Sequence, residues 1–381
     1  MKRLHAWVVM GAAALALSCA AGARAEDGIT PAEIRIGMAN ALSGPAAGLG
    51  KGMKAGAETY IARINAAGGV NGRKIVLVPK DDGYEPAHTA ATTESLIVGD
   101  KVFALFNYVG TPTSSVAMPM AAKSEVPYLF PFTGAEFLRN PVNKWVFNVR
   151  ASYYDETEAM VERLTRDLGY RKIAVFMQDD AFGVAVRNGV AKAMEKRGMK
   201  IHAVTRFKRN TLDVDDGVEA MKQAQPEAVV FVGTYKQLAA IVKKSKAAGV
   251  NARYLTVSFI GTENFIAEAG ADGDGVYITQ VMPSPEDAAV PIVREYLSDM
   301  KGSNLGYTSL EGYVNAVVLV EALRRLGPSP TRAGLVRTLE SLSADVGGLQ
   351  VAFTNSNHQG SSSVFLTRVQ GGKAVPQSKM Q

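Results

Sequence analysis

The chain has 381 residues, of which 47% are hydrophobic, so it can bury two apolar cores and is longer than one compact domain usually is. The formal charge is +6, but three of the basic residues lie in an N-terminal leader, and the remainder carries only +3. This modest charge, without basic clusters interleaved with aromatic residues, does not support nucleic-acid binding.

The first 25 residues have the pattern of a signal peptide. Two basic residues precede an apolar, alanine-rich run at 7–21, and the Ala-Arg-Ala run at 23–25 suits a signal peptidase. We therefore predict secretion, with cleavage after Ala25. Two alternatives stay open: an uncleaved membrane anchor, and a lipoprotein modified at Cys19 that lacks the usual leucine three positions earlier. Because Cys19 is the only cysteine, the cleaved chain would contain no disulfide.

Residues 34–82 predict a βαβ unit. A short strand at 34–39 runs into the glycine-rich loop LSGPAAGLG. An amphipathic helix follows and ends at the glycine pair 68–69. A second strand at 75–78 completes the unit, whose crossover should be right-handed.

Strands and helices continue to alternate along the rest of the chain, which predicts an α/β fold with parallel sheets covered by helices. Strands are expected at 102–106, 127–130 and 145–149, with a helix that begins near Thr113. A second alternation begins after Arg150, with helices at 155–168, 182–197, 214–224 and 238–248, and strands at 173–177, 201–205, 228–232, 254–257 and 276–281. The end is predicted to hold helices at 288–301, 309–326 and 331–341 and strands at 349–353 and 364–369.

The run SGP, the helix after it, INAAGGVNGRK and a strand that ends in DD together resemble the leucine/isoleucine/valine-binding proteins. These are periplasmic solute receptors of ABC transporters. The resemblance is dense at 34–82 and thinner onward to about Arg368. It implies two Rossmann-like lobes, the type I periplasmic binding protein fold, joined by a three-crossing hinge. Crossings near Arg150, Met282 and Gly348 would give an N-terminal lobe of 26–149 plus 283–347 and a C-terminal lobe of 150–282 plus 348–381.

Motifs for catalysis or for cofactors are not found in the sequence. The histidines are scattered, and no paired-histidine or GxSxG spacing occurs. The glycine loop 44–51 lacks the spacing and hydroxyl residue of a phosphate loop. The acidic loop 269–275 lacks a third oxygen ligand and the distal glutamate of a calcium site. We therefore expect no cofactor, no metal and no enzymatic activity.

Loops at the carboxyl ends of the predicted strands form the candidate site, because open α/β sheets bind ligands there, beside helix N-termini. The loop 108–114 offers backbone N–H groups and hydroxyls for a carboxylate, although its hydroxyl residues could simply cap the next helix. The resemblance aligns Gly110, Phe132 and Gly134 with positions that hold ligand. The first-lobe candidates are Ser43, Leu49, Tyr108, Gly110, Thr111, Thr113, Phe132, Thr133 and Gly134.

The second half of the chain contributes an expected aromatic wall, which is typical of small-molecule sites, although core packing explains any single aromatic residue equally well. The resemblance places tyrosines of the leucine receptors at Phe182 and Thr234. The candidates here are Tyr153, Tyr154, Phe182, Thr234, Tyr235, Ser258 and Phe259. Arg150, at the hinge, is expected to form an ion pair with Asp155 or Glu156, or else to hold an anionic ligand group.

Ser258 departs from the family pattern, because the resemblance places there a glutamate that pairs with the ammonium group of the ligand. A buried ammonium without a counter-charge is costly. We therefore predict a small carboxylate or amide ligand, which could be aromatic, bound more tightly than leucine. Glu263, Asp179 and Asp180 are alternative partners for an ammonium.

The sequence as a whole predicts a periplasmic substrate-binding protein of a branched-chain-amino-acid-type ABC importer. It would capture a small amino-acid-like or carboxylate solute by hinge closure. The expected partners are this small-molecule ligand and ABC permease subunits of the inner membrane, with no nucleic acid, and the chain should be a monomer. The alternative is a periplasmic ligand-sensing subunit of a signalling system with the same fold.

Overall fold

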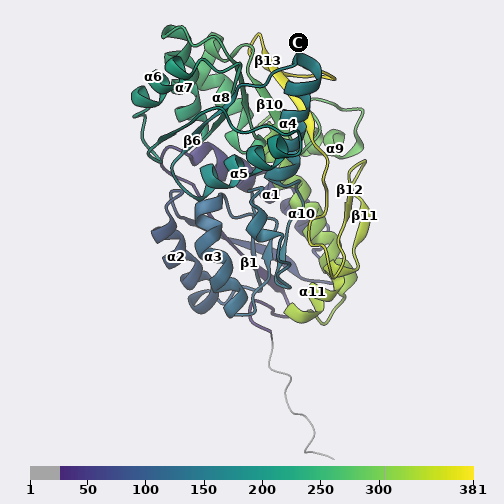
Figure 1. Cartoon of the computed structure of the whole chain (residues 1–381). Coiled ribbons are helices and arrows are strands. Elements are labelled where there is room, and N and C mark those ends of the chain that lie inside the picture. Colours follow the sequence, from purple (N-terminus) through teal and green to yellow (C-terminus); the bar gives the residue numbers. More distant parts are fainter. Residues whose placement is uncertain (1–25, 304) are drawn as a thin grey trace, which may run out of the picture.

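The computed structural model of the protein describes residues 26–303 and 305–381. The predicted signal peptide and Cys19 lie outside the described residues. Across the described ranges, we find no helix with the length and apolar character needed to cross a membrane. The predicted α/β class is confirmed, and the chain forms two lobes, one above the other in Figure 1.

The first lobe is built on a parallel sheet with the strand order β2-β1-β3-β4-β5. Strands β3, β4 and β5 are short, apolar and fully buried, because helices cover both faces of the sheet. In chain order the elements are β1 (Glu33–Asn40), α1 (Ala47–Ala66), β2 (Lys74–Asp81), α2 (Pro86–Glu94), β3 (Ala104–Phe106), α3 (Thr111–Lys123), β4 (Tyr128–Leu129) and β5 (Val146–Phe147).

The second lobe holds a larger sheet, in the order β14-β13-β10-β9-β8-β6-β7. Strands β6 to β10 are parallel, and β13 and β14 are antiparallel additions at one edge. The elements are α4 (Tyr153–Leu168), β6 (Ile173–Gln178), α5 (Ala181–Glu195), β7 (Val204–Phe207), α6 (Asp215–Ala224), β8 (Ala228–Val232), α7 (Tyr235–Ala247), β9 (Arg253–Thr256), α8 (Thr262–Ala269), β10 (Tyr277–Gln280), β13 (Phe365–Gln370) and β14 (Lys373–Pro376).

Between β10 and β13 the chain returns to the first lobe. This part contains α9 (Pro291–Met300), α10 (Tyr307–Leu326), α11 (Arg332–Glu340) and the two-stranded ribbon of β11 (Ser343–Asp345) and β12 (Gln350–Ala352). In Figure 1, α11 lies at the base with β1, whereas α6, α7 and α8 lie in the upper lobe.

Helix α10 packs on α1 with the two backbones in direct contact. A Cβ atom added at Gly56 of α1 would lie 1.8 Å from the carbonyl oxygen of Ser309, and one at Gly312 would lie 2.2 Å from that of Met53. Only glycine permits this approach. The contact fixes the first turns of α10 at the boundary between the lobes, where Thr308 and Glu311 are buried.

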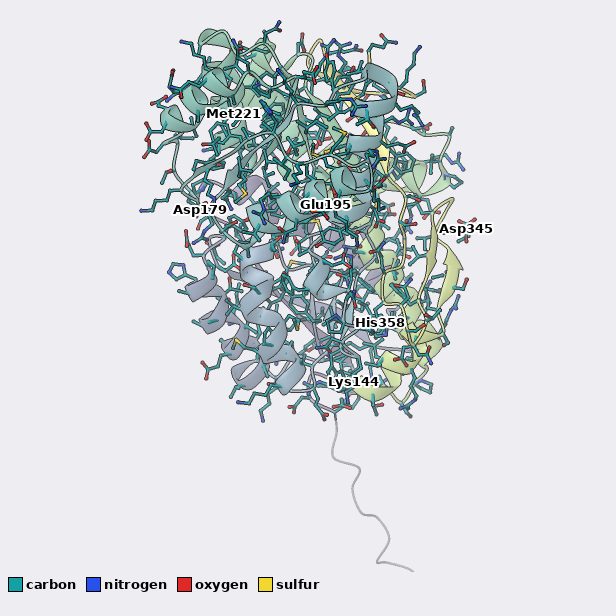
Figure 2. All side chains as sticks on the ribbon, in the orientation of Figure 1. Lys144, Asp179, Glu195, Met221, Asp345 and His358 are labelled. Atoms are coloured by element: carbon teal, nitrogen blue, oxygen red, sulfur yellow. The ribbon has the colours of Figure 1, made fainter. Side chains whose placement is uncertain are left out.

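The third crossing between the lobes occurs later than the predicted position near Gly348. The imidazole of His358 stacks on Phe147 of β5 at 3.9 Å, and the carbonyl of His358 accepts a hydrogen bond from the Asn148 N–H at 2.9 Å. Figure 2 accordingly shows His358 within the lower lobe. The chain therefore stays with the first lobe to about residue 360 and crosses at 361–364, while the remaining lobe boundaries stay a prediction.

Candidate functional site

The two lobes meet along a closed seam at the carboxyl ends of their strands. At one end, Arg209 forms an ion pair of 2.7 Å with Glu85 of the first lobe. In the middle, the Gly48 N–H donates to the Tyr235 hydroxyl at 3.2 Å. At the other end, the Tyr307 N–H donates to the Glu263 carboxylate at 3.0 Å. Residues far apart in the sequence therefore form one shared interface.

An aromatic cluster fills the centre of this seam. The Phe259 ring lies 5.2 Å from that of Phe132, 4.7 Å from Phe182 and 6.0 Å from Tyr84. The Tyr153 ring is 5.4 Å from Phe182. All five rings are at most 2% exposed. The structure thus brings together four of the predicted aromatic residues, with Phe132 and Tyr84 from the first lobe.

Tyr84 was not predicted as a site residue. It follows β2 in the sequence DDGYEP, where it adopts a left-handed backbone conformation with φ of 63°. Its backbone N–H is held by the Asp82 carboxylate at 2.9 Å. One signal in the sequence could have identified Tyr84: it is an aromatic residue in the loop after a strand, two positions beyond a pair of aspartates.

A buried cluster of charges lies beside the aromatic rings, centred on Arg150. The guanidinium is 3.5 Å from Glu156 of α4 and 3.5 Å from Glu311 of α10, and it stands 4.8 Å above the Phe132 ring. The Arg150 guanidinium also donates to the Ser258 hydroxyl. Arg150 and the two carboxylates are at most 3% exposed. The predicted ion pair between Arg150 and Glu156 is present, and Glu311 is a partner that was not predicted.

Glu156 is held firmly in this cluster. Its carboxylate accepts hydrogen bonds from the Ser258 N–H at 2.8 Å, the Ser258 hydroxyl at 3.0 Å and the Thr279 hydroxyl at 2.6 Å. Asp155, the other predicted partner of Arg150, instead completes the N-terminal cap of α4 with Ser152. Ser258 therefore supports a carboxylate that comes from a neighbouring helix.

Glu311 differs from Glu156 in its surroundings. Burial raises the pKa of Glu311 to about 7, against the opposing attraction of Arg150. Its Oε1 atom, and the Nε and Nη1 atoms of Arg150, have no hydrogen-bond partner among the described residues. Glu311 is visible in the sequence as the one charged residue in the first four turns of α10. Two buried carboxylates that were not predicted as ligand partners, Glu156 and Glu311, therefore lie close to Ser258, and both already face Arg150.

A small cavity borders these groups. Its lining comes from both lobes and from the second crossing: Phe132, Ser258, Gln280, Val281, Met282, Tyr307, Thr308 and Glu311. The cavity has no room for the centre of a water molecule. Small-molecule sites commonly hold roughly 300–1,000 Å³, so the lobes must part before a ligand can enter.

The loop 108–114, which was predicted to receive a carboxylate, has its side chains engaged within the first lobe. The Gly110 N–H donates to the Phe132 carbonyl at 3.2 Å, and the Thr113 hydroxyl donates to the backbone carbonyls of Val109 and Gly110. The Tyr108 hydroxyl is 3.2 Å from that of Thr93. The hydroxyl of Thr113 is therefore engaged by backbone carbonyls, but no side chain of the described residues caps α3, whose N-cap residue is Gly110, so the capping alternative is not supported either.

The other first-lobe candidates lie around this loop. Thr111 and Thr133 share a hydrogen bond of 2.6 Å, and the Thr133 hydroxyl contacts that of Tyr153 at 3.3 Å. Gly134 allows Tyr153 to approach, since a Cβ there would lie 2.6 Å from its ring. Ser43 is exposed, whereas Leu49 is buried against the second lobe at Gly261.

Two second-lobe candidates lie away from the cavity. Tyr154 does not face the seam as expected: it lines an outer groove between α4 and α5, where Lys192 stands 4.8 Å from its ring. The Thr234 hydroxyl is bonded to the Gln237 side chain. Tyr235 contacts the first lobe through Gly48, as described above.

The acidic residues weighed as partners for an ammonium have structural roles. Asp180 caps α5, and its carboxylate accepts from the Phe182 N–H at 2.9 Å. Asp179 is exposed and forms an ion pair of 3.0 Å with Arg206 (Figure 2, left edge). Glu263 accepts from the first turn of α10. No group of three or more metal-ligating side chains occurs within 26–303 and 305–381.

Comparison with known proteins places the chain in a family. The profile of the family described as periplasmic binding protein matches residues 33–374. A possible leucine/isoleucine/valine-binding protein from Rhodopirellula baltica is similar in structure, with a TM-score of 0.87 and 32% identity over 93% of this chain and 98% of that one.

Two further relatives are more distant. Leu/Ile/Val-binding protein homolog 3 of Brucella melitensis is 25% identical over 81% of this chain and 83% of its own length. A branched chain amino acid ABC transporter protein of Thermus thermophilus, solved with bound valine, has a TM-score of 0.80 and 23% identity over 91% of this chain and 96% of that one, which supports the fold alone. The family match covers most of the chain, and this protein therefore belongs to the periplasmic binding proteins.

Proposed function

We propose that this protein captures a small amino-acid-like or carboxylate solute in the periplasm and delivers it to an ABC importer of the branched-chain-amino-acid type. The observation that carries the proposal is the seam, where Phe132 and Glu311 of one lobe and Ser258 of the other line one cavity. Behind this lining, Phe259 packs on Phe132 and Arg150 lies beside Glu311. The names of the relatives agree with such a role.

The proposed mechanism is hinge closure. The solute meets one lobe while the seam is open, and the other lobe then rotates over it and removes it from water. Closure is favoured to the extent that the solute binds the closed form more tightly than the open form. The permease would recognise the closed form, which links transport to the presence of solute.

The test begins with the bound solute. Protein purified from the periplasm is analysed by native mass spectrometry, and any co-purifying compound is titrated back into the stripped protein by calorimetry. We expect one small compound to bind at one site per chain. Uptake of that compound should fall when the gene is deleted; unchanged uptake, with loss of a signalling response, would favour the sensor instead.

The proposed ligand class is a small carboxylate or amide, bound more tightly than leucine, because Glu156 and Glu311 already face Arg150 and leave no spare counter-charge for an ammonium among the described residues of this cluster. Calorimetric titrations of leucine, isoleucine, valine and phenylalanine should be compared with their deaminated acids and with simple aromatic acids. Sub-micromolar binding of leucine, with no response to the acids, would contradict this ligand class without affecting the transport proposal.

The proposed export route has its own test. N-terminal sequencing of periplasmic material should give a first residue of Glu26, because the Ala-Arg-Ala run precedes it. A diacylglycerol group on Cys19 would establish the lipoprotein alternative.

A further inference from the structure

Two neighbouring residues at the edge of the cavity keep three buried polar atoms without a hydrogen bond to any described residue. Arg150 keeps two N–H positions, Nε and Nη1, without a hydrogen-bond partner among the described residues, and Glu311 keeps Oε1. Both side chains are at least 97% buried. A buried polar group without a hydrogen bond costs roughly 1–3 kcal/mol. A ligand that forms hydrogen bonds with these atoms would therefore gain binding free energy.

The two residues lie beside each other at the edge of the cavity, Arg150 at the first crossing and Glu311 in the first lobe. Glu311 lines the cavity with Ser258 and Thr308, and the Arg150 Nη1 atom is 3.5 Å from Glu311 Oε1 without the alignment of a hydrogen bond. Donors and an acceptor therefore lie side by side. A ligand group inserted here must offer an acceptor to Arg150 and a donor to Glu311.

We propose that Arg150 and Glu311 together receive the polar group of the solute, and that they select a primary amide over the carboxylate of the same carbon skeleton. The proposal rests on the solute-binding function above and specifies its ligand. An amide carbonyl accepts from the Arg150 guanidinium, while its NH₂ group donates to the Glu311 carboxylate.

Charge explains the selection. Three charged groups act electrostatically on Glu311: Arg150, Glu156 and Arg139, a buried residue whose guanidinium donates to the carbonyls of Ala135 and Arg150. These four groups sum to zero when both glutamates are ionised. An amide leaves this balance unchanged. A carboxylate adds a buried negative charge beside Glu311 and has no hydrogen-bond donor for the Glu311 carboxylate. An unbalanced buried charge is costly.

The adjoining rings suit a small carbon skeleton. Phe132 lines the cavity and lies under the Arg150 guanidinium, and Phe259 stands next to it. A flat or branched apolar group attached to the amide would rest on these rings while its polar end meets Arg150 and Glu311. Benzamide and isovaleramide are therefore suitable probes, with benzoate and isovalerate as their matched acids.

The experiment is calorimetry on the full mature chain at pH 8, where Glu311 is ionised, with these two pairs. We expect each amide to bind at least about tenfold more tightly than its acid. In Glu311→Gln the ratio of amide to acid affinity should fall at least about fivefold, because the acid no longer meets a like charge. Equal binding of amide and acid by the wild type, or an unchanged ratio in Glu311→Gln, would overturn the proposal.

The matched control is Glu263→Gln, since Glu263 is a carboxylate at the same seam but outside this cavity. It should change the affinity for amide and acid by the same factor. If Glu311→Gln does not fold, the wild-type ratio at pH 8 and pH 5.5 decides: it should fall at the lower pH, and a constant ratio would contradict the proposal. Binding of another solute but of neither amide overturns this inference alone, whereas the absence of any bound or titrated solute overturns the proposed function as well.

Discussion

The loop 108–114 and the pair of Arg150 and Glu311 both lie beside the seam, yet they differ in what packing leaves available. In the loop, the hydroxyl of Thr113 donates to backbone carbonyls, and the hydroxyl of Ser114 accepts from Tyr128 at 2.9 Å. In the pair, three buried polar atoms have no hydrogen-bond partner in the described part of the chain. A position at a strand end therefore does not by itself leave polar side-chain atoms available for a ligand.

The largest effect is expected from a substitution that breaks the charge cluster around Arg150. Arg150→Ala leaves Glu156 and Glu311 buried without their counter-charge, which should lower the free energy of unfolding by roughly 3–5 kcal/mol in urea titrations. Arg206→Ala is the control, because its ion pair with Asp179 is about half exposed and should contribute about 1 kcal/mol or less. Similar losses in both variants would show that the buried cluster is not charged.

The next effect is a pH dependence. The pKa of Glu311 rises from 4.5 to about 7 on folding, so the folded chain holds this proton more tightly than the unfolded chain. The stabilisation that comes from this bound proton is therefore complete below pH 4.5 and is lost as the pH rises toward and above 7. This loss lowers the free energy of unfolding by about 3 kcal/mol.

Glu311→Gln removes this titration. The free energy of unfolding of the wild type relative to Glu311→Gln should therefore fall between pH 5 and pH 8, as measured by urea unfolding at both values. A difference that stays constant, or that grows in favour of the wild type at pH 8, would contradict the raised pKa.

The smallest effect concerns the loop. Thr113→Val removes a hydroxyl that bonds backbone carbonyls, which should cost about 1 kcal/mol of stability. Because this hydroxyl is already engaged, the affinity for solute should change less than about twofold. A tenfold weaker affinity, measured by calorimetry, would return the loop to the binding site.

Much of the fold could be predicted from the sequence, because strands and helices are marked by local patterns. The apolar run at 102–106 predicted β3, and the glycine pair 68–69 predicted the end of α1. Helix α2 was not predicted, since its sequence PAHTAATTE has small residues and hardly any apolar periodicity. The third crossing was misplaced because the stacking of His358 on Phe147 depends on residues far apart in the chain.

The candidate site was harder to predict, for a related reason. Phe132, Phe182 and Phe259 were correctly grouped, because each follows a strand that ends at the seam. Glu311 was missed, since its role depends on the contact between α1 and α10 that brings the first turns of α10 to Arg150. The hydrogen bond between Ser258 and Glu156 was not predicted, because Glu156 lies on α4, far from Ser258 in the sequence.

The central claim, that a solute is captured between the lobes, is tested most directly by a distance across the seam. The mature chain would have no cysteine, so spin labels can be attached through Val98→Cys in the first lobe and Leu212→Cys in the second, at positions that are 66% and 56% exposed. Pulsed electron paramagnetic resonance then gives the distribution of distances between the two spin labels, with and without the co-purifying solute. We predict a longer distance in a substantial part of the solute-free sample and a single shorter distance at saturation. An identical distribution in both samples, with binding verified by calorimetry, would contradict capture by closure of the lobes.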